Sequence, residues 1–334
     1  MIARDFKPKI SFIYGRGFPS YIKRDRDILC KSFIVESHSY SRVFSLWPIA
    51  KSVIRTNLSI VWFANELTAF VVLLSKIFKK KVIVITGGSM VLCDLYPNCK
   101  AIGVYYRLSH RIAAKYVAGA ADILLTVSKY ELKGILKNNR PKNIRLCYHG
   151  FEIEKFYPNE IKKNIVLTTS ETINKEYFEV KDLDKVLKVA KLLPKLQFII
   201  LGRFADNEIE SFMKRESPPN VLYPGFVSGK ELLNYFQKSK VYIQLSRHEG
   251  FGCAIAEAML CECTPVVTEN GAIPEVVGEE GYYVSTDNIE GIAHGIKLAI
   301  SNPKGKTARK RIIKEFPIEK RVKTIKDIIN HILN

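Results

Sequence analysis

The sequence predicts an α/β protein made of two Rossmann-like domains, each a parallel sheet covered by helices. Three observations support this fold class. The chain has 334 residues, which suits two domains of about 160 residues better than one. Continuous apolar runs alternate with helical patterns, as in parallel sheets that are buried on both faces. The alternation stops at a polar stretch, residues 159–163, and then begins again.

The first half of the chain contains four apolar runs that predict strands, and helical patterns lie between them. The strands are expected at residues 10–14, 59–63, 81–86 and 122–127, and the helices at 21–31, 67–78 and 103–119. A further helix is expected to begin at Ser128, because Glu131 three residues later fits a capping box. Apolar strands that alternate with helices in this way indicate a parallel sheet.

The second half repeats the pattern. Strands are expected at residues 164–168, 196–201, 221–223 and 241–245, and helices at 183–193 and 229–239. Residues 319–333 carry apolar side chains at helical spacing and predict a helix at the C-terminus. We therefore assign residues 1–160 and 161–312 to the two domains, and residues 313–334 to a C-terminal helix.

Composition limits the class of protein. The seven cysteines lack zinc-ribbon spacing, so we expect reduced thiols of the kind found in cytosolic proteins. No apolar run approaches the roughly 18 residues of a membrane span. Residues 1–9 lack the apolar core of a secretory signal and lead directly into a strand. These features together predict a cytoplasmic protein.

The sharpest signal is the stretch Glu249–Glu257, which reads E-G-F-G-C-A-I-A-E. A predicted strand ends just before it, and a helical run follows its glycines. This arrangement points backbone N–H groups and the positive end of a helix dipole toward the loop, where they bind phosphate. Glu249 then lies beside the anion, and Glu257 can accept hydrogen bonds from hydroxyls attached to it. The pattern suits a sugar nucleotide; an ordinary βα unit with an incidental glutamate pair is the plain alternative.

Residues 246–259, together with 264–267 and 271–277, resemble the donor site of retaining glycosyltransferases of family four. The resemblance implies the GT-B fold, in which two Rossmann-like domains face each other across a cleft and a C-terminal helix crosses back to the first domain. It implies transfer of a sugar from a UDP or GDP donor to an acceptor hydroxyl, with the anomeric configuration retained. It also implies that neither a metal nor a cofactor is needed.

The resemblance assigns roles to the residues of this motif. Glu249 would be the catalytic residue, because it would hold the donor sugar or stabilise positive charge at the anomeric carbon. Glu257 would accept hydrogen bonds from the ribose hydroxyls. The loop residues between the two glutamates would bind the donor: Gly250, Phe251, Gly252 and Cys253.

Two lysines are implied as further donor-binding residues. Lys181 takes the position of a family lysine that neutralises the donor diphosphate, although Asp182 stands where glycine is usual. Lys175 is the candidate for the basic partner of that lysine, displaced by extra residues. A solvated lysine at the start of a helix is the alternative for Lys181.

Two backbone segments are also implied in donor binding. Val227 lies in a segment, residues 223–227, that is similar to one whose backbone contacts the base. Gly15 and Gly17 fit a glycine loop that approaches the donor phosphate and the acceptor. A simple tight turn explains the two glycines equally well.

Some positions depart from the family pattern. Residues 87–90 contain no histidine where the family often has one near the donor sugar, which leaves open a catalytically weak nucleotide-sugar-binding homologue. His248 is interpreted as a structural residue of the loop.

A sugar-nucleotide epimerase would share the fold but would need a different set of acids in its cleft. A phosphorylase would need a longer chain and a lysine for pyridoxal phosphate.

The first half also carries an unusual charge. Residues 1–160 hold 26 basic and 11 acidic side chains, whereas residues 161–334 hold 26 and 22. Such a field attracts anionic lipid, nucleic acid or a phosphorylated acceptor. Two segments fit membrane docking: residues 105–116, with Arg107, Arg111 and Lys115 at helical spacing, and residues 78–81, with three lysines.

The charge and the resemblance together predict the partners. We expect a nucleotide-sugar donor, a glycan or lipid-linked acceptor, and an anionic membrane surface on which the protein is peripheral. A soluble acidic acceptor is the alternative explanation of the basic residues. Nucleic acid is not indicated, because the sequence contains no recognised DNA- or RNA-binding motif.

Overall fold

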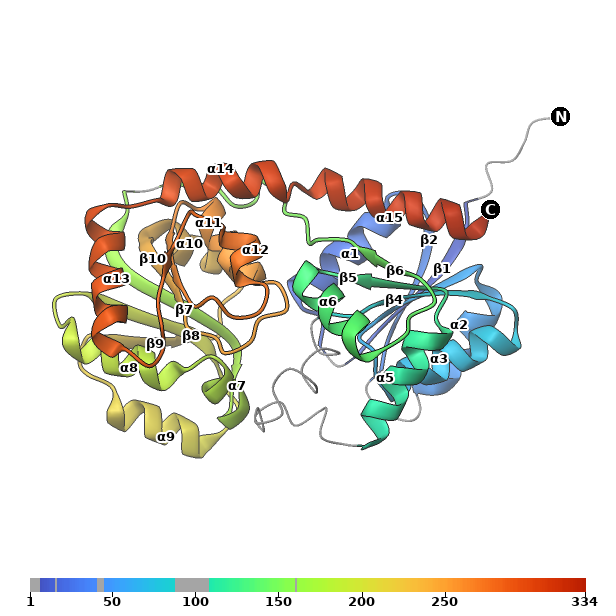
Figure 1. Cartoon of the computed structure of the whole chain (residues 1–334), viewed down its shortest axis with the longest axis horizontal. Helices are drawn as coiled ribbons and strands as arrows, with labels where there is room; N and C mark the ends of the chain where they lie inside the picture. The colour runs from blue at the N-terminus through green and yellow to red at the C-terminus, as the bar shows by residue number, and fades with distance from the viewer. Residues whose placement is uncertain (1–6, 16, 41–44, 88–107, 160) are drawn as a thin grey trace. The chain divides into compact units, whose positions relative to one another are not determined.

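The computed structural model describes residues 7–15, 17–40, 45–87, 108–159 and 161–334. The chain divides into two compact units (Figure 1). Unit 1 contains the described residues up to His149 together with Glu319–Asn334, and unit 2 contains Gly150–Ile318. The first division falls before Gly150 rather than after residue 160, and Phe151 forms a parallel bridge with Pro317 within unit 2.

Unit 1 contains one parallel sheet, in which the described residues supply six strands in the order β2-β1-β3-β4-β5-β6. The strands are β1 (Lys9–Tyr14), β2 (Ile34–Ser39), β3 (Leu58–Trp62), β4 (Lys81–Ile85), β5 (Ile123–Thr126) and β6 (Ile144–Leu146). The helices are α1 (Ser20–Cys30), α2 (Leu46–Arg55), α3 (Glu66–Ile77), α5 (Leu108–Ala120), α6 (Lys129–Asn138) and α15 (Ile318–Leu333). The strand order reverses between β1 and β3, where ligands bind in open α/β sheets.

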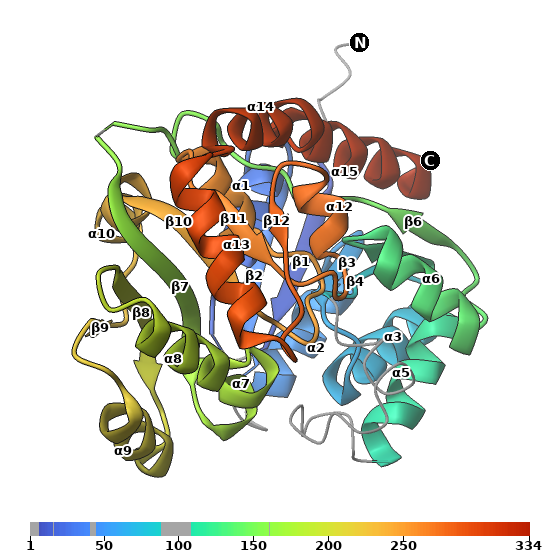
Figure 2. The ribbon, with the colours of Figure 1, turned by 60° about the vertical axis from the view of Figure 1, so that its left-hand side comes forward.

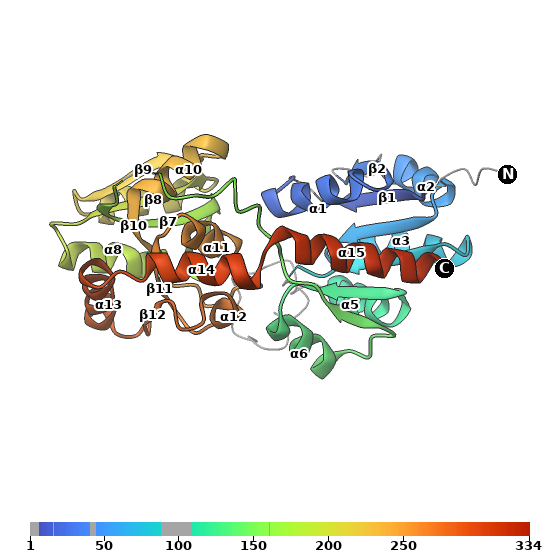
Figure 3. The ribbon, with the colours of Figure 1, turned by 90° about the horizontal axis from the view of Figure 1, so that it is seen from above.

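Helices cover both faces of the unit 1 sheet. Buried side chains of α2, α3 and α5 pack on one face, against Val61, Val82 and Val84. On the other face, α1 and α15 enclose a small apolar space together with β3, β4 and β5, and Figure 3 shows α15 lying along this unit. The C-terminal helix is therefore part of the core of unit 1, as the resemblance implied.

Unit 2 contains a second parallel sheet, for which the described residues supply strands in the order β12-β11-β10-β7-β8-β9. The strands are β7 (Lys163–Ile173), β8 (Gln197–Phe204), β9 (Val221–Gly225), β10 (Ser239–Gln244), β11 (Thr264–Val267) and β12 (Tyr282–Tyr283). The helices are α7 (Lys175–Val180), α8 (Leu183–Leu192), α9 (Asn207–Glu216), α10 (Gly229–Lys238), α11 (Cys253–Leu260), α12 (Ile273–Val277), α13 (Ile289–Ser301) and α14 (Gly305–Glu315). This is the Rossmann strand order, and it reverses between β7 and β10.

The two faces of the unit 2 sheet are covered by different helices. Val241 and Ile243 of β10, and Leu245 directly after it, point into a core built with α8 and α13, which lie side by side in Figure 2. On the other face, α10, α11 and α14 pack on β10, β11 and β7. Tyr242 and Gln244 of β10 therefore point toward the helix of the E-x7-E motif.

The predicted fold class is confirmed, and most boundaries differ from the prediction by one to three residues. The capping box is confirmed: Ser128 Oγ accepts from the N–H of Glu131 at 3.1 Å, and the Glu131 carboxylate accepts from the N–H of Val127 at 3.0 Å. The segment 313–334 was predicted as one C-terminal helix. In the structure, residues 313–315 belong to α14 and a new helix begins at Ile318. Residues 103–107 of the predicted helix at 103–119 lie outside the described residues.

Candidate functional site

A loop that carries Glu249 joins β10 to α11 at the carboxyl edge of the unit 2 sheet, and Glu257, the second glutamate of the E-x7-E motif, lies within α11. Gly252 caps α11 with a left-handed φ of 100°, which a side chain rarely adopts. A Cβ on Gly252 would also lie 2.9 Å from Ile255 Cδ1. Glycine is therefore needed for the loop to enter the helix at this angle. The first N–H groups of α11 face this loop, which gives the geometry expected of a phosphate site.

Glu249 is half-buried on the loop, and its carboxylate is held from the sheet. Gln244 Nε2 donates to Glu249 Oε2 at 2.5 Å. Gln244 Oε1 accepts from the Tyr242 hydroxyl at 3.2 Å, and Thr169 Oγ1 lies 2.9 Å from the Tyr242 oxygen. The orientation of the predicted catalytic carboxylate is thus set by side chains of β7 and β10.

Glu257 lies in the second turn of α11 and is 5% exposed. Both glutamates of the motif act on the same neighbour. Burial raises the pKa of Tyr242 well above its usual value, the hydrogen bond with Thr169 opposes this, and the negative charges of Glu249 and Glu257 raise the pKa further. The charges of both carboxylates therefore act on Tyr242.

A second loop, between β11 and α12, fixes the backbone of Glu249. Gly271 has a left-handed φ of 64°, and a Cβ there would lie 2.3 Å from the carbonyl oxygen of Glu249. The N–H of Ala272 donates to that same oxygen at 2.9 Å. Glycine at 271 thus permits the close approach of the two loops, which explains the glycine in the segment 271–277.

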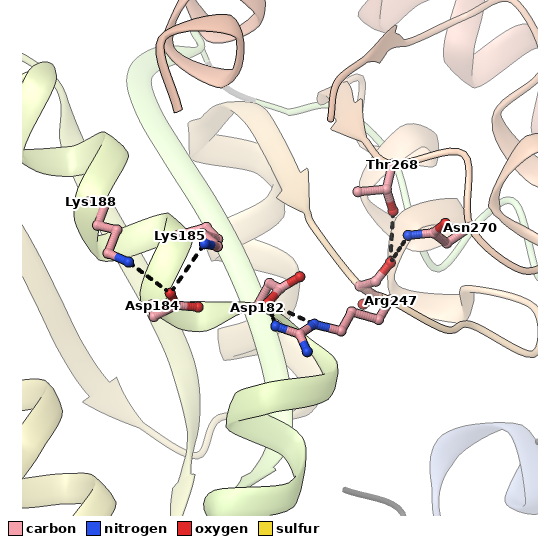
Figure 4. Close-up of polar contacts among 8 residues, drawn as sticks. Asp182, Asp184, Lys185, Lys188, Arg247, Thr268 and Asn270 are labelled. Carbon is pink, nitrogen blue, oxygen red and sulfur yellow. Dashed lines mark hydrogen bonds and ion pairs between the residues drawn. The ribbon is translucent and has the colours of Figure 1, made fainter. Parts of the chain in front are cut away.

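Figure 4 shows a further set of contacts that hold the residues before Glu249. The side chains of Thr268 and Asn270 donate to the Ser246 carbonyl at 2.8 and 3.1 Å. Arg247 Nε and Nη2 donate to Asp182 Oδ1 at 2.9 and 2.6 Å. The Arg247 side chain is 54% exposed, whereas that of Asp182 is 1% exposed. The buried Asp182 carboxylate therefore holds the exposed Arg247 guanidinium through its Nε and Nη2 atoms.

Asp182 occupies a conformation that favours glycine. Its φ is 46°, in the left-handed region, and it caps the start of α8. Asparagine and aspartate tolerate this region better than most residues, so the substitution is sterically understandable. Because Asp182 follows Lys181 directly, its bond to Arg247 places Arg247 close to the predicted diphosphate-binding lysine.

The other predicted donor residues take varied positions. Lys181 is half-buried at the end of α7, and Lys175 is exposed at the start of the same short helix, which accounts for the extra residues between them. Val227 is 8% exposed in the loop between β9 and α10. The Phe251 side chain is buried against Phe316, with ring centroids 5.4 Å apart. A donor contact from Phe251 would therefore come from its backbone.

Cys253 and Gly250 are half-buried at the start of α11 and in its preceding loop. His248 is 7% exposed, consistent with its interpretation as a structural residue. Gly15 and Gly17 belong to unit 1, where they follow β1; Gly17 has a φ of 85°. Residues 88–90, which the sequence singled out for the missing histidine, lie outside the described residues.

Sequence reasoning missed Gln244, Tyr242 and Arg247. The signal for the first two was present, because the strand alternates Val241, Ile243 and Leu245 with polar side chains. Such alternation places the polar groups on one face. Arg247 could not be found in this way, since its partner Asp182 is distant in sequence.

Within the residues that the structure describes, no group of three or more His, Cys, Asp or Glu side chains is placed to hold a metal ion. Asp182 and Asp184 form an Asp-x-Asp sequence, but both contact basic side chains. Asp184 Oδ2 lies 3.2 Å from Lys188 Nζ and 3.7 Å from Lys185 Nζ (Figure 4). The described cysteines are free thiols, and Cys93 and Cys99 lie outside the described residues.

Comparison with known proteins gives a family match over most of unit 2. Residues 153–316 match the family model described as Glycosyl transferases group 1. A Campylobacter jejuni enzyme, N-acetylgalactosamine-N,N'-diacetylbacillosaminyl-diphospho-undecaprenol 4-alpha-N-acetylgalactosaminyltransferase, is 25% identical over 228 residues, which are 64% of this chain and 60% of that protein. The chain spans about half the length of the curated relatives that it matches.

Solved structures show the fold. Sucrose-phosphate synthase from Thermosynechococcus elongatus superposes with a TM-score of 0.78 at 14% identity, covering 98% of this chain and 99% of that one. Anabaena Alr3699/HepE in complex with UDP and glucose gives a TM-score of 0.76 at 15% identity, covering 97% and 100%. With its two parallel six-stranded sheets in the described residues, the chain has the GT-B fold.

Proposed function

Because residues 153–316 match the family model of the glycosyl transferases group 1, we propose that this chain transfers a sugar from a nucleoside diphosphate donor to an acceptor hydroxyl. The observation that carries the proposal is the E-x7-E loop at the carboxyl edge of the unit 2 sheet. There the loop carries Glu249 and leads into the start of α11 beside the β7–β10 reversal, and the charges of Glu249 and Glu257 both act on Tyr242 of β10.

The donor is held from its phosphate end and from its ribose. The N–H groups at the start of α11 bind the diphosphate, because they carry the positive end of the helix dipole. Glu257, nearly buried, accepts hydrogen bonds from the ribose hydroxyls. The backbone around Val227 contacts the base, and a role of Gly15 and Gly17 of unit 1 in donor binding stays a prediction. UDP and GDP are the donor nucleotides that we propose.

Positive side chains stabilise the leaving diphosphate. Lys181 is one of them, and Lys175 was the candidate for the other. Arg247 is a second candidate, since its guanidinium is anchored to the residue after Lys181 and half of its side chain is exposed. A planar guanidinium binds phosphate in a bidentate manner, so it suits this role.

The chemistry follows from this arrangement. As the bond between the anomeric carbon and the diphosphate oxygen breaks, positive charge develops on the sugar and negative charge on the diphosphate. Glu249 stabilises the first, and the start of α11 with the basic side chains stabilises the second. The acceptor hydroxyl attacks from the face that the diphosphate leaves, and a phosphate oxygen takes its proton. The anomeric configuration is retained, and neither metal nor cofactor enters these steps.

We predict that Glu257→Ala weakens nucleoside diphosphate binding by about 1–3 kcal/mol, because charge-assisted hydrogen bonds to the ribose are lost. Titration calorimetry with UDP and GDP measures this directly. Glu290→Ala, at an exposed position in the first turn of α13, is the matched control and should bind as the wild type does. Unchanged affinity in a folded Glu257→Ala protein would contradict the ribose assignment.

Unit 1 has features that fit a membrane-linked acceptor. Helices α3 and α5 lie side by side in this unit and expose large apolar side chains, among them Ile77 at 62% and Ile112 at 60%. Arg111, Lys115 and Tyr116 are exposed on α5, whereas Arg107 of the predicted stripe lies outside the described residues. The lysine run follows α3, which ends at Ile77, and Lys81 begins β4. No helix in the described part of the chain has the length and apolar character of a membrane span.

We predict reversible docking of this α3–α5 surface on anionic membranes. Each basic group near such a surface contributes about 1 kcal/mol, and salt screens the attraction. In co-sedimentation with phosphatidylglycerol vesicles, the protein should pellet with the vesicles at low salt and stay in the supernatant at high salt. Arg111→Glu with Lys115→Glu should abolish binding, while Lys230→Glu, exposed on unit 2, should not. A wild-type protein that stays in the supernatant at low salt would favour a soluble acceptor.

A further inference from the structure

A row of hydrogen-bonded polar side chains in unit 2 begins on β7 and ends at Glu249. Thr169 of β7 lies 2.9 Å from the Tyr242 oxygen, and the Tyr242 hydroxyl donates to Gln244 Oε1 at 3.2 Å. Gln244 Nε2 then donates to Glu249 Oε2 at 2.5 Å. Tyr242 is fully buried and Gln244 is 3% exposed, so water is excluded from the bond between them, while Thr169 and Glu249 at the two ends are partly exposed.

The hydrogen bonds of this row all run in one direction, from Thr169 toward Glu249. Burial raises the pKa of Tyr242, so its phenol stays protonated and has a single hydrogen to donate. Since that hydrogen goes to Gln244 Oε1, the Thr169 hydroxyl must donate to the Tyr242 oxygen. With Oε1 occupied, the amide group of Gln244 can turn only its Nε2 toward Glu249. An ionised carboxylate accepts and does not donate, so it suits the end of this row.

These hydrogen-bonded side chains lie where the strand order of unit 2 reverses. Tyr242 of β10 pairs in register with Leu167 of β7, so Gln244 is level with Thr169, two residues further along each strand. Gln244 is the last residue of β10, next to the loop that carries Glu249, whereas β7 continues past Thr169 to Ile173. Open α/β sheets bind their ligands at such a reversal. The hydrogen-bonded side chains therefore connect the sheet to the proposed donor site.

We propose that Gln244, oriented by Tyr242, is a positioning residue that aims the Glu249 carboxylate at the donor sugar. This inference rests on the proposed glycosyl transfer. A buried glutamine costs stability unless it is hydrogen-bonded, and an apolar residue would fill the same place in this strand more simply. Both the oxygen and the nitrogen of the Gln244 amide are hydrogen-bonded, and the nitrogen donates to Glu249, the residue to which we assign the reaction.

The test compares turnover with nucleotide binding. Purified protein is given UDP-glucose or GDP-mannose with water as acceptor, and release of the nucleoside diphosphate is followed. Gln244→Leu removes the donor to Glu249 and should lower turnover by about tenfold to a hundredfold, the scale of a misplaced reacting group. Gln244→Glu has the same shape but faces Glu249 with a second carboxylate, so it should lower turnover at least as much. Affinity for free UDP or GDP should stay within a few-fold in both.

A double mutant separates positioning from folding. If Gln244 acts through Glu249, Gln244→Leu should lower turnover little further in a Glu249→Gln background, because the aimed group is already gone. Tyr242→Phe, which removes only a hydroxyl, carries the same test if Gln244→Leu does not fold. Thr168→Val is the matched control, a buried threonine on β7 next to Thr169 but on the opposite face of the sheet. Its turnover should equal that of the wild type.

The outcomes are distinct. Lost turnover, retained nucleotide affinity and non-additivity with Glu249→Gln support the positioning role. Wild-type turnover in folded Gln244→Leu, or losses that simply add to those of Glu249→Gln, overturn the role while the proposed function stands. A wild-type protein that neither binds nor cleaves any sugar nucleotide overturns both.

Discussion

Glu249→Gln should lower turnover by about a hundredfold or more while leaving affinity for the nucleoside diphosphate within a few-fold. The two side chains have nearly the same shape, so the loop contacts through Gly271 and Ala272 are expected to persist. What is lost is the negative charge that stabilises the positive charge developing on the sugar. Initial rates with UDP-glucose and GDP-mannose measure the loss, and calorimetry with UDP and GDP measures the affinity.

The control for this change is Glu279→Gln, which alters an exposed glutamate of unit 2 away from the loop and should leave turnover unchanged. Proton NMR of the wild-type product should show that the anomeric configuration of the donor is kept. An inverted product, or full activity in the Glu249→Gln protein, would contradict the mechanism.

Arg321→Leu should destabilise unit 1 by about 3–5 kcal/mol, the usual cost of removing one partner of a buried ion pair. Arg321 of α15 and Asp25 of α1 are each 1% exposed, and two contacts of 2.6 Å join them. Arg321 Nη1 also donates to the carbonyls of Cys147 and Tyr148, at 2.7 and 2.8 Å. The substitution leaves a carboxylate and two carbonyls buried without these donors. Urea unfolding followed by tryptophan fluorescence reports on unit 1, because both tryptophans, Trp47 and Trp62, belong to it.

Two further variants show whether the ion pair causes the effect. Arg321→Leu combined with Asp25→Leu removes both charges and should recover much of the lost stability. Lys323→Ala, at an exposed position on the same helix, should change the free energy of unfolding by less than about 0.5 kcal/mol. An Arg321→Leu protein as stable as the wild type would mean that α15 is not anchored through this pair.

Much of the fold could be predicted because its central strands are continuous apolar runs. The strands β3, β4 and β5 are buried along nearly their whole length, so their sequences carry a clear signal. The edge strand β2 was missed, since its sequence, IVESHS, is polar and its side chains are partly exposed. The division between the units could not be read from the polar stretch 159–163, because it depends on contacts distant in sequence, such as the pairing of Phe151 with Pro317 within unit 2.

The candidate site was predictable where local sequence sets the geometry. Gly252 and the strand–turn–helix order indicated the phosphate loop, and the spacing of Glu249 and Glu257 indicated two carboxylates around it. The hydrogen bonds from β7 to Glu249 could not be predicted, since Thr169 and Tyr242 meet only through the order of strands in the sheet. The bond between Asp182 and Arg247 was hidden for the same reason, because two loops distant in sequence meet there.

Nucleotide binding tests the central claim most directly. Thermal unfolding of the wild-type protein should be measured with UDP, GDP, ADP and their sugar conjugates at millimolar concentration. A ligand that binds the folded state raises the melting temperature by mass action, so one nucleoside diphosphate and its conjugates should raise it and Glu257→Ala should reduce the rise. If none of these nucleotides changes the melting temperature of the wild type, the loop between β10 and α11 is not a sugar-nucleotide site.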